Sequence, residues 1–373
     1  MMKMIIKIML FLAVSLNLQA QINDWPVFRG KSSLSGISDF EITESPVLAW
    51  KVATGGRTKS SPVLSEGILY FGNEKGTVFA ISSDGKAKWK FETGSPVEAP
   101  PMVFAGKVFA GSADGNLRAI HKVNGELAWN YKTDNKIAGS ANAWESGSKS
   151  GIVIGSYDYF LHCIDAQSGK PLWKLETQNY VNGTPAIFGR SVIFGGCDGI
   201  MRIADVISGL ETDTINIGVY IAASPAISSG RSYFGDYEGE LYCVDLKSRK
   251  VEWQVTATEN AGPIIAIPAA GNNSVVIGND DKYMYCFNLN TGKQNWKYRT
   301  NGPITGSAVI SPTKVLFGST DGYIYLLNLS DGKKIWNFNA GAPVGSSPVV
   351  TRDRFYFLTE DGRLLAFETK NQK

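Results

Sequence analysis

The chain has 373 residues, a formal net charge of +3, 43% hydrophobic residues, 11% aromatic residues and 40 glycines. With 37 basic and 34 acidic residues and no charge run, it lacks the clustered basic surface that a nucleic-acid partner would need. The abundant glycines and aromatics favour an all-β protein of short strands and turns around a sizeable core.

Residues 1–20 are predicted to be a secretory signal peptide. Two lysines precede the apolar run 8–16, and Ala20 is the expected cleavage point. The alternative is an N-terminal membrane anchor, although the run is short for the roughly 20 residues that span a bilayer. No cysteine precedes Cys163, which argues against lipid anchoring through a cysteine. We therefore expect an exported, soluble protein, periplasmic or outer-membrane-associated, with no transmembrane segment after signal removal.

One repeat unit accounts for most of the remaining chain, and its clearest copy is Val315–Trp336. An alternating apolar run closes on Gly318, the pair Asp321-Gly322 follows, and a second alternating run leads to Trp336. Alternation places side chains on the two faces of a strand, and Asp-Gly suits a tight hairpin turn. The unit is therefore predicted to be a series of short antiparallel strands.

The tryptophan that ends the unit recurs every 39–44 residues, apart from one position where Asp213 replaces it. A period of about 40–45 residues with four strands is typical of a propeller blade. No stretch has the i, i+3, i+4, i+7 pattern that helical repeats require. The predicted docking tryptophans are Trp50, Trp89, Trp129, Trp173, Trp253, Trp296 and Trp336.

The two ends of the repeat region predict how the ring closes. Val47–Thr54 has the pattern of a last blade strand, whereas 346–369 has the early strands and stops before a tryptophan strand. We predict an eight-bladed β-propeller of four-stranded antiparallel blades over residues 47–373, with the N-terminal strand completing the last blade and removing an open sheet edge. Residues 21–46 are expected to form an irregular arm packed on this ring.

Departures from the repeat suggest where the protein binds. Asp213 marks a softer blade seam or an interface, and a tryptophan there is expected to raise the melting temperature. Insertions fall at 259–263, on the face of the loops between blades, and at 144–150, on the opposite face, where Trp144 is expected to be presented. Neutral drift is the alternative. The candidate interaction residues are Trp144, Glu145, Glu259, Asn260, Lys59, Tyr180 and Tyr220.

Three segments carry a resemblance to a known family: Cys163-Ile164-Asp165 with Ser168-Gly169-Lys170 and Trp173, Cys243-Val244-Asp245 with Trp253, and Cys286-Phe287-Asn288 with Thr291-Gly292-Lys293 and Trp296. They resemble the tryptophan-docking repeat A-x-D-x-x-T-G-x-x-x-W of PQQ-like propellers. The resemblance implies that each tryptophan packs against the next blade near a repeat glycine. It also implies two possible functions, because the family includes quinoprotein dehydrogenases and non-catalytic proteins of the BamB-like branch.

The enzyme branch resembles this chain less well. Its members use adjacent cysteines, pyrroloquinoline quinone (PQQ) and calcium, and no two cysteines are adjacent here. Cys163, Cys243 and Cys286 share one repeat position and are predicted to be unpaired buried thiols. Glu98 and Asn182, before two innermost strands, are the only candidate calcium ligands. The two histidines fall in different blades, so no zinc site or triad is predicted.

We therefore predict an exported, monomeric, non-catalytic propeller that binds protein partners, such as an outer-membrane assembly complex, as the BamB-like branch implies. No cofactor is expected. The alternatives are a PQQ- and calcium-dependent alcohol or sugar dehydrogenase, and a carbohydrate-binding propeller that uses exposed aromatics such as Tyr180 and Tyr220.

Overall fold

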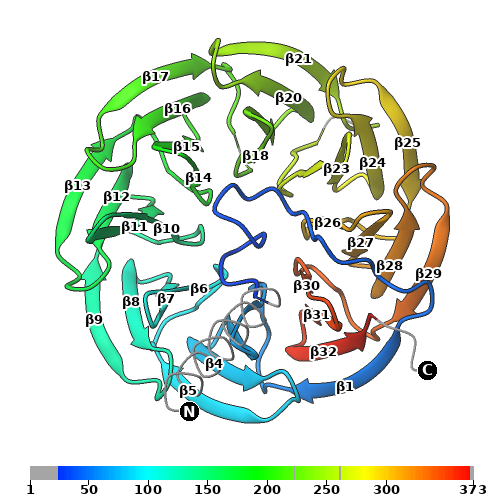
Figure 1. Cartoon of the computed structure of the whole chain (residues 1–373), viewed down its shortest axis with the longest axis horizontal. Coiled ribbons are helices and arrows are strands. Elements are labelled where there is room, and N and C mark those ends of the chain that lie inside the picture. The colour runs from blue at the N-terminus through cyan, green and yellow to red at the C-terminus, as the bar shows by residue number, and fades with distance from the viewer. Residues whose placement is uncertain (1–23, 222, 260–261, 370–373) are drawn as a thin grey trace, which may run out of the picture.

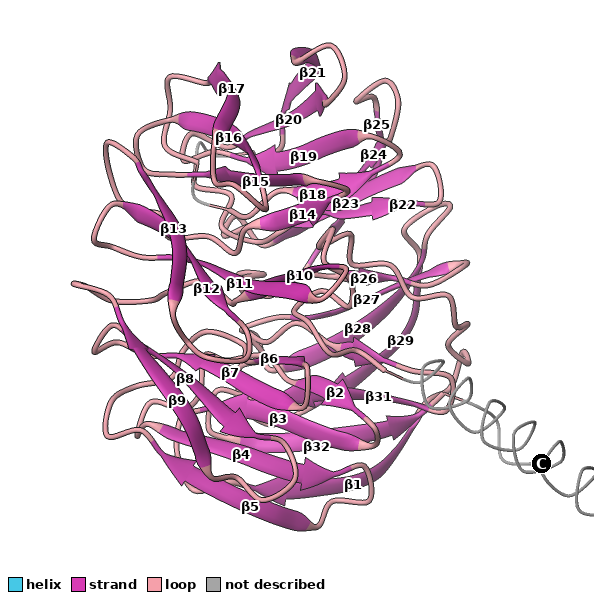
Figure 2. Ribbon diagram, turned by 60° about the vertical axis from the view of Figure 1, so that its left-hand side comes forward, coloured by secondary structure: helices cyan, strands magenta, loops and turns pink. Residues whose placement is uncertain are grey.

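The computed structural model describes residues 24–221, 223–259 and 262–369, which form a ring of blades around a central axis (Figure 1). These residues form eight four-stranded antiparallel sheets, and they contain strands and loops only (Figure 2). The predicted all-β, eight-bladed propeller is confirmed. The predicted signal peptide and Asn260 lie outside the described residues.

Seven blades consist of consecutive strands, numbered here from the innermost strand outward. Blade 1 consists of β2 (Val63–Ser65), β3 (Ile68–Gly72), β4 (Thr77–Ser82) and β5 (Ala87–Glu92), and blade 2 of β6 (Met102–Phe104), β7 (Lys107–Gly111), β8 (Asn116–His121) and β9 (Leu127–Lys132). Blade 3 consists of β10 (Asn142–Ser146), β11 (Lys149–Gly155), β12 (Phe160–Asp165) and β13 (Pro171–Glu176), and blade 4 of β14 (Ala186–Phe188), β15 (Ser191–Gly195), β16 (Ile200–Asp205) and β17 (Glu211–Asn216). Blade 5 consists of β18 (Ala226–Ser228), β19 (Arg231–Gly235), β20 (Glu240–Asp245) and β21 (Lys250–Thr256), and blade 6 of β22 (Ala269–Gly271), β23 (Ser274–Gly278), β24 (Tyr283–Asn288) and β25 (Gln294–Arg299). Blade 7 consists of β26 (Val309–Ile310), β27 (Lys314–Gly318), β28 (Tyr323–Asn328) and β29 (Lys334–Asn339).

Blade 8 joins the two ends of the described chain. Its inner strands are β30 (Val349–Val350), β31 (Arg354–Leu358) and β32 (Arg363–Glu368), and its outermost strand is β1 (Val47–Ala53). β1 pairs antiparallel with β32, from Val47 opposite Glu368 to Ala53 opposite Arg363. The predicted ring closure is confirmed, and the sheet edge that an unfinished blade would expose is covered.

The strands follow the alternation in the sequence, and their burial depends on their place in the blade. β4 is buried at every residue, because blades on both sides cover its two faces. The outermost strand β5 alternates between exposed and half-buried residues, and its inward side chains include Trp89. The core of the ring is therefore a series of seams between neighbouring sheets.

A tryptophan on the outermost strand fills most of these seams. The indole of Trp173 lies over Gly209 of the next blade, where an added Cβ would be 2.5 Å from the ring, and its Nε1 donates to the carbonyl of Val206 at 3.2 Å. Gly209 has a φ of 73°, which a residue with a side chain adopts only under strain. The same contact joins Trp50 to Gly85, Trp89 to Gly125, Trp129 to Gly169, Trp253 to Gly292 and Trp296 to Gly332.

In the seam between blades 7 and 8, Trp336 packs against aromatic rings of blade 8. The rings of Trp336 and Phe367 are 5.7 Å apart and nearly perpendicular, with an interplanar angle of 82°. Phe355 packs edge-on against the same indole. Edge-to-face pairs of this kind add about 0.5–1.5 kcal/mol beyond the area that they bury.

Blades 4 and 5 meet through a different pair of residues. Asp213 occupies the tryptophan position, and Arg249, with a φ of 62°, occupies the glycine position. The Nε of Arg249 lies 3.3 Å from Asp213, and its Nη1 donates to the carbonyl of Leu246. The carbonyl of Leu246 occupies the same repeat position as the carbonyl of Val206 in the neighbouring seam. The guanidinium of Arg249 therefore donates to a carbonyl that accepts from an indole in the neighbouring seam.

The insertion at 144–150 lengthens the hairpin of β10 and β11, and the expected exposure of Trp144 is wrong. Trp144 pairs with Gly151 across the hairpin, is 6% exposed, and its Nε1 donates to the sulfur of Cys163 at 3.3 Å. Trp144 occupies the third ladder position, which regular blades also have, and its indole packs in the blade 3–4 seam, while the two additional ladder pairs lie beyond it. Glu145, the next residue, points outward and is exposed.

The described part of the arm, residues 24–46, crosses the middle of the ring (Figure 1). It lies on the face that carries the turn between the first and second strands of each blade, such as the turn between β2 and β3. Trp25 exchanges two backbone hydrogen bonds with Leu64 of blade 1, and the arm then accepts backbone bonds from Val103, Ile187, Ile227, Ala270 and Ile310, on the inner strands of blades 2, 4, 5, 6 and 7. The Nδ2 of Asn142 in blade 3 donates to Ser32, and Thr43 donates to Thr369 beyond β32. The arm therefore ties all eight blades together on this face, which we call the arm face.

The Asp213 seam gives a stability prediction that revises the expectation from sequence. Asp213→Trp alone should leave the melting temperature unchanged or lower it, because Arg249 has a side chain at the glycine position over which the other indoles pack. Asp213→Trp together with Arg249→Gly should raise the free energy of unfolding by about 1–2 kcal/mol, because it buries an indole and removes a positive φ from a non-glycine residue. Thermal unfolding of the two variants tests this, and a gain from the single change alone would contradict it.

Candidate functional site

At the end of the central axis opposite the arm lies a funnel of about 230 Å³. Residues from the loops before the innermost strands of all eight blades line it, and Phe28 of the arm also contributes. Lys59, Glu98 and Asn182, three residues singled out from the sequence, lie together in this lining. We call the side of the ring with these loops the funnel face.

A circle of hydroxyl groups supports the funnel. The backbone N–H of Ser140 donates to Oγ1 of Thr184 at 2.9 Å, and the N–H of Thr184 donates to Oγ of Ser224 at 2.7 Å. The same hydrogen bond, from a backbone N–H to a serine Oγ of the next blade, joins Ile267 to Ser307, Ser307 to Ser347, and Ser347 to Ser61 across the ring closure. The distances are 2.8, 3.0 and 2.9 Å. These residues were not identified from the sequence, although a serine or threonine recurs two residues before the innermost strand in six of the eight blades.

Aspartates fix the loops around the funnel. Asp321 accepts bonds from the hydroxyl of Tyr325 at 2.7 Å and from the backbone of Asn301, in the preceding loop, at 3.0 Å. Asp158 makes the corresponding contacts with His162 and Asp134, at 3.0 and 3.1 Å. The turn and the loop of neighbouring blades are thereby held in one geometry, so the funnel face is rigid.

His162 belongs to this scaffold. Its Nδ1 lies 3.0 Å from the hydroxyl of Tyr131, its other ring nitrogen faces Asp158, and it is 4% exposed. Burial lowers the pKa of His162, and the bond to Asp158 opposes that shift. A buried imidazole between an aspartate and a tyrosine stabilises the blade 3 turn, and no substrate could reach it without local unfolding.

Glu98, the acidic side chain in the funnel lining, lies between two ammonium groups. Lys136 Nζ is 2.6 Å from one carboxylate oxygen and Lys59 Nζ is 3.3 Å from the other. The hydrogen bond from Lys136 is the main reason that the pKa of Glu98 lies below its ordinary value. Glu98 therefore remains ionised and is already neutralised by cations of the chain.

Calcium with a quinone does not fit this lining. A calcium ion at Glu98 would have to displace two lysines, and it would then lie next to their positive charges. Among the described residues, no group of three or more histidines, cysteines, aspartates or glutamates is placed to hold a metal. The four cysteines, all in the described part, are free thiols, and burial raises the pKa of Cys163 and Cys243 to about 12.

Five tyrosines rise beside the funnel on blades 3 to 5, and we call them the tyrosine rim: Tyr157, Tyr159, Tyr180, Tyr220 and Tyr237. Tyr157 and Tyr180 stack with ring centroids 4.5 Å apart, and Tyr159 leans on the same ring at 5.3 Å. Tyr220 and Tyr237 pair edge-on and are 54% and 53% exposed.

The rim was found only in part from the sequence. Tyr180 and Tyr220 were identified as exposed aromatics, but their partners lie on the turns that follow β11 and β19 and were missed. The sequence did contain a signal for these partners, because Tyr157 in blade 3 and Tyr237 in blade 5 occupy the same repeat position, which Cys197 occupies in blade 4. Backbone bonds from Cys197 to Tyr180 and from Tyr237 to Tyr220, both 3.0 Å, join each turn to its neighbouring loop.

The remaining sequence candidates do not gather at the funnel. Glu259 is exposed on the outer part of the funnel face, where it pairs with Lys297 and its backbone donates to Asp281 at 2.9 Å. Glu145 lies on the hairpin of blade 3, on the arm face. The structure therefore brings together Lys59, Glu98 and Asn182, places Tyr180 and Tyr220 beside them, and separates the other candidates.

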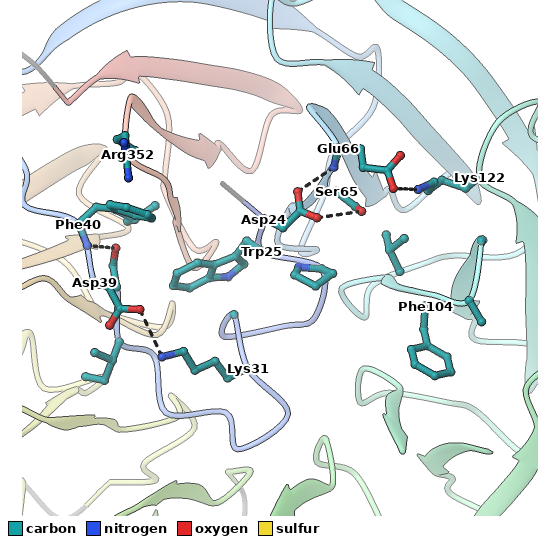
Figure 3. A pocket seen from close by; sticks show the side chains of 18 residues that line it. Asp24, Trp25, Lys31, Asp39, Phe40, Ser65, Glu66, Phe104, Lys122 and Arg352 are labelled. Carbon is teal, nitrogen blue, oxygen red and sulfur yellow. Dashed lines mark hydrogen bonds and ion pairs between the residues drawn. The ribbon is translucent and has the colours of Figure 1, made fainter. Parts of the chain in front are cut away.

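A larger pocket, of about 860 Å³, lies on the arm face between the arm and blades 1, 2 and 8 (Figure 3). Lys31 is 3.6 Å from Asp39, and Lys122 is 2.7 Å from Glu66. Asp24 accepts a bond from the backbone of Glu66 at 2.8 Å, and burial raises its pKa. The first pair lies within the arm, the second joins blades 2 and 1, and the Asp24 bond joins the arm to blade 1, so these polar groups are already used in contacts within the fold.

Comparison with known proteins gives the family. Residues 44–148 and 209–373 match the family model described as outer membrane protein assembly factor BamB. The chain belongs to this family. The BamB of Moranella endobia is 20% identical over 66% of the chain and 55% of its own length. The dehydrogenase subunit of a quinone alcohol dehydrogenase from Gluconobacter oxydans is 23% identical over 47% of the chain, but over 21% of its own length.

Solved structures of a BamB and of a quinohemoprotein dehydrogenase both resemble the fold of this chain. BamB from Moraxella catarrhalis superposes with a TM-score of 0.73 and 18% identity, covering 88% of this chain and 99% of that one. A quinohemoprotein alcohol dehydrogenase from Comamonas testosteroni superposes with a TM-score of 0.78 and 13% identity, covering 95% of this chain and 82% of that one. The chain spans between 9% and 55% of the curated relatives that it matches.

The ion pairs of Glu98 give a pH-dependent prediction. Glu98→Gln should lower the free energy of unfolding at neutral pH by about 0.2–1 kcal/mol, the range for partly exposed pairs. The folded-state pKa is lowered, so this stabilisation is present above the ordinary value of 4.5 and is lost as the pH falls through the lowered value. Thermal unfolding at neutral and acidic pH, with Glu145→Gln as control, measures it. A deficit that persists in acid would contradict the ion-pair account.

Proposed function

We propose that this protein is an exported, non-catalytic scaffold that assists the assembly of outer-membrane proteins by binding polypeptide segments on its funnel face. The tyrosine rim carries the proposal, because it places a cluster of partly exposed aromatic rings beside a rigid funnel. Tyrosine supplies a large contact area at a low cost in side-chain entropy and is enriched in protein interfaces. The match to the assembly-factor family supports the same role.

The chemistry of the funnel supports binding over catalysis. Its carboxylate is neutralised by Lys136 and Lys59, and the hydroxyls of its lining accept backbone bonds from neighbouring blades. In the described residues, no helix is long and apolar enough to span a membrane. Export through residues 1–20 and a monomeric state are parts of this proposal.

The experiment is complementation in cells that lack the gene. We expect outer-membrane β-barrel proteins to fall in amount, the wild-type chain to restore them, and Tyr180→Ala with Tyr220→Ala to restore them several-fold less well. The melting temperature should fall only slightly, because the changes remove ring contacts at the surface and leave the blade seams intact. Val123→Ala, a control on the arm face at a side chain that is 87% exposed, should restore them fully. Equal restoration by the rim variant would contradict the proposal.

Titration with PQQ, with and without calcium, separates this role from the dehydrogenase alternative. Calcium-dependent binding that is lost in Glu98→Ala would overturn the scaffold proposal. Binding of a soluble glycan that is lost in the rim variant would favour the carbohydrate-binding alternative. Absence of both, with the fold intact, is the expected result.

A further inference from the structure

The seam between blades 4 and 5 holds an open groove of about 440 Å³ on the arm face, away from the funnel. Ile193, Ile203 and Leu246 form its apolar floor, and each is at most 8% exposed. Phe188 stands at its edge and is 47% exposed. Lys247 and Arg249 supply the polar side. Its volume lies in the range of about 300–1,000 Å³ that is usual for ligand sites.

The other seams show which side chain suits this place. In blade 3, for example, the indole of Trp173 on the outermost strand covers the turn between β16 and β17 of the next blade and donates to a backbone carbonyl. Between blades 4 and 5 the chain supplies Asp213, which is too short to cover the apolar floor. Arg249 reaches the carbonyl of Leu246 but leaves the floor beside Phe188 open.

A separate segment already fills the inner end of the same seam. Leu34 of the arm is fully buried and belongs to the same hydrophobic cluster as Ile193, Ile203 and Leu246. Trp25 and Val27 of the arm enter other cores of the ring in the same way. Apolar side chains brought in from outside a blade are therefore an established way to complete these seams.

We propose that the Asp213 groove binds an aromatic side chain, tryptophan best, presented by a partner polypeptide. The ring lies on Ile193 and Ile203 beside Phe188, and the guanidinium of Arg249 stacks on its face as a cation on an aromatic ring. The partner then supplies the side chain that seven other seams take from their own blade. This site is independent of the tyrosine rim, so the two can fail separately.

The probes are 5-fluoroindole and N-acetyl-5-fluorotryptophanamide, followed by fluorine NMR during titration with the full chain. We expect saturable line broadening with both probes. Asp213→Trp with Arg249→Gly should weaken binding at least tenfold, because the chain then fills the groove with its own indole. Phe188→Ala, a milder change at an exposed residue, should also weaken it. Tyr180→Ala and Val123→Ala should leave it unchanged.

Three results would overturn the inference. The first is no saturable binding by wild type, or equal binding by the filled variant. The second is binding of 5-fluoroindole without the amide, which would assign the groove to a free heteroaromatic molecule. The third is a dimer in sedimentation velocity that the filled variant abolishes, which would make a second copy of this chain the occupant.

Discussion

The contact of an indole with a glycine of the next blade holds this ring together. Each blade is a sheet with two apolar faces, and neither face is stable unless a neighbour covers it. The indole covers the outer part of the seam, and the glycine lets the ring approach a backbone that no Cβ could share. Gly209 shows both requirements, since an added Cβ would meet Trp173 at 2.5 Å and its φ is positive.

Two further devices act where the seams alone would leave the ring open. β1 completes blade 8, and the hydroxyl circle passes from Ser347 to Ser61 over the same closure. The arm then bonds to the inner strands across the arm face. Because one end is covered by the arm and the other is shaped by rigid loops, the funnel face can present the tyrosine rim in a fixed arrangement.

The periodic part of the structure could be predicted from the sequence, and the aperiodic part could not. Blade number, strand order, closure and the docking tryptophans follow from a strict repeat. Trp144 was misplaced because an insertion can lengthen a ladder as readily as it can form an exposed loop. The path of the arm has no repeat to indicate it. The exchange of tryptophan and glycine for Asp213 and Arg249 was visible in both repeat columns, but only the distance between the two side chains shows that they act as a pair.

The account places binding at the tyrosine rim on the funnel face and at the Asp213 groove on the arm face. Site-specific photocrosslinking in intact cells tests this, with a photoreactive residue at Tyr180 or Phe188 and controls at Val123 and Leu127, which are exposed on blade 2. The account predicts crosslinks to polypeptides at the first two positions and none at the controls. Equal yields at all four positions, or crosslinks at the controls alone, would contradict it.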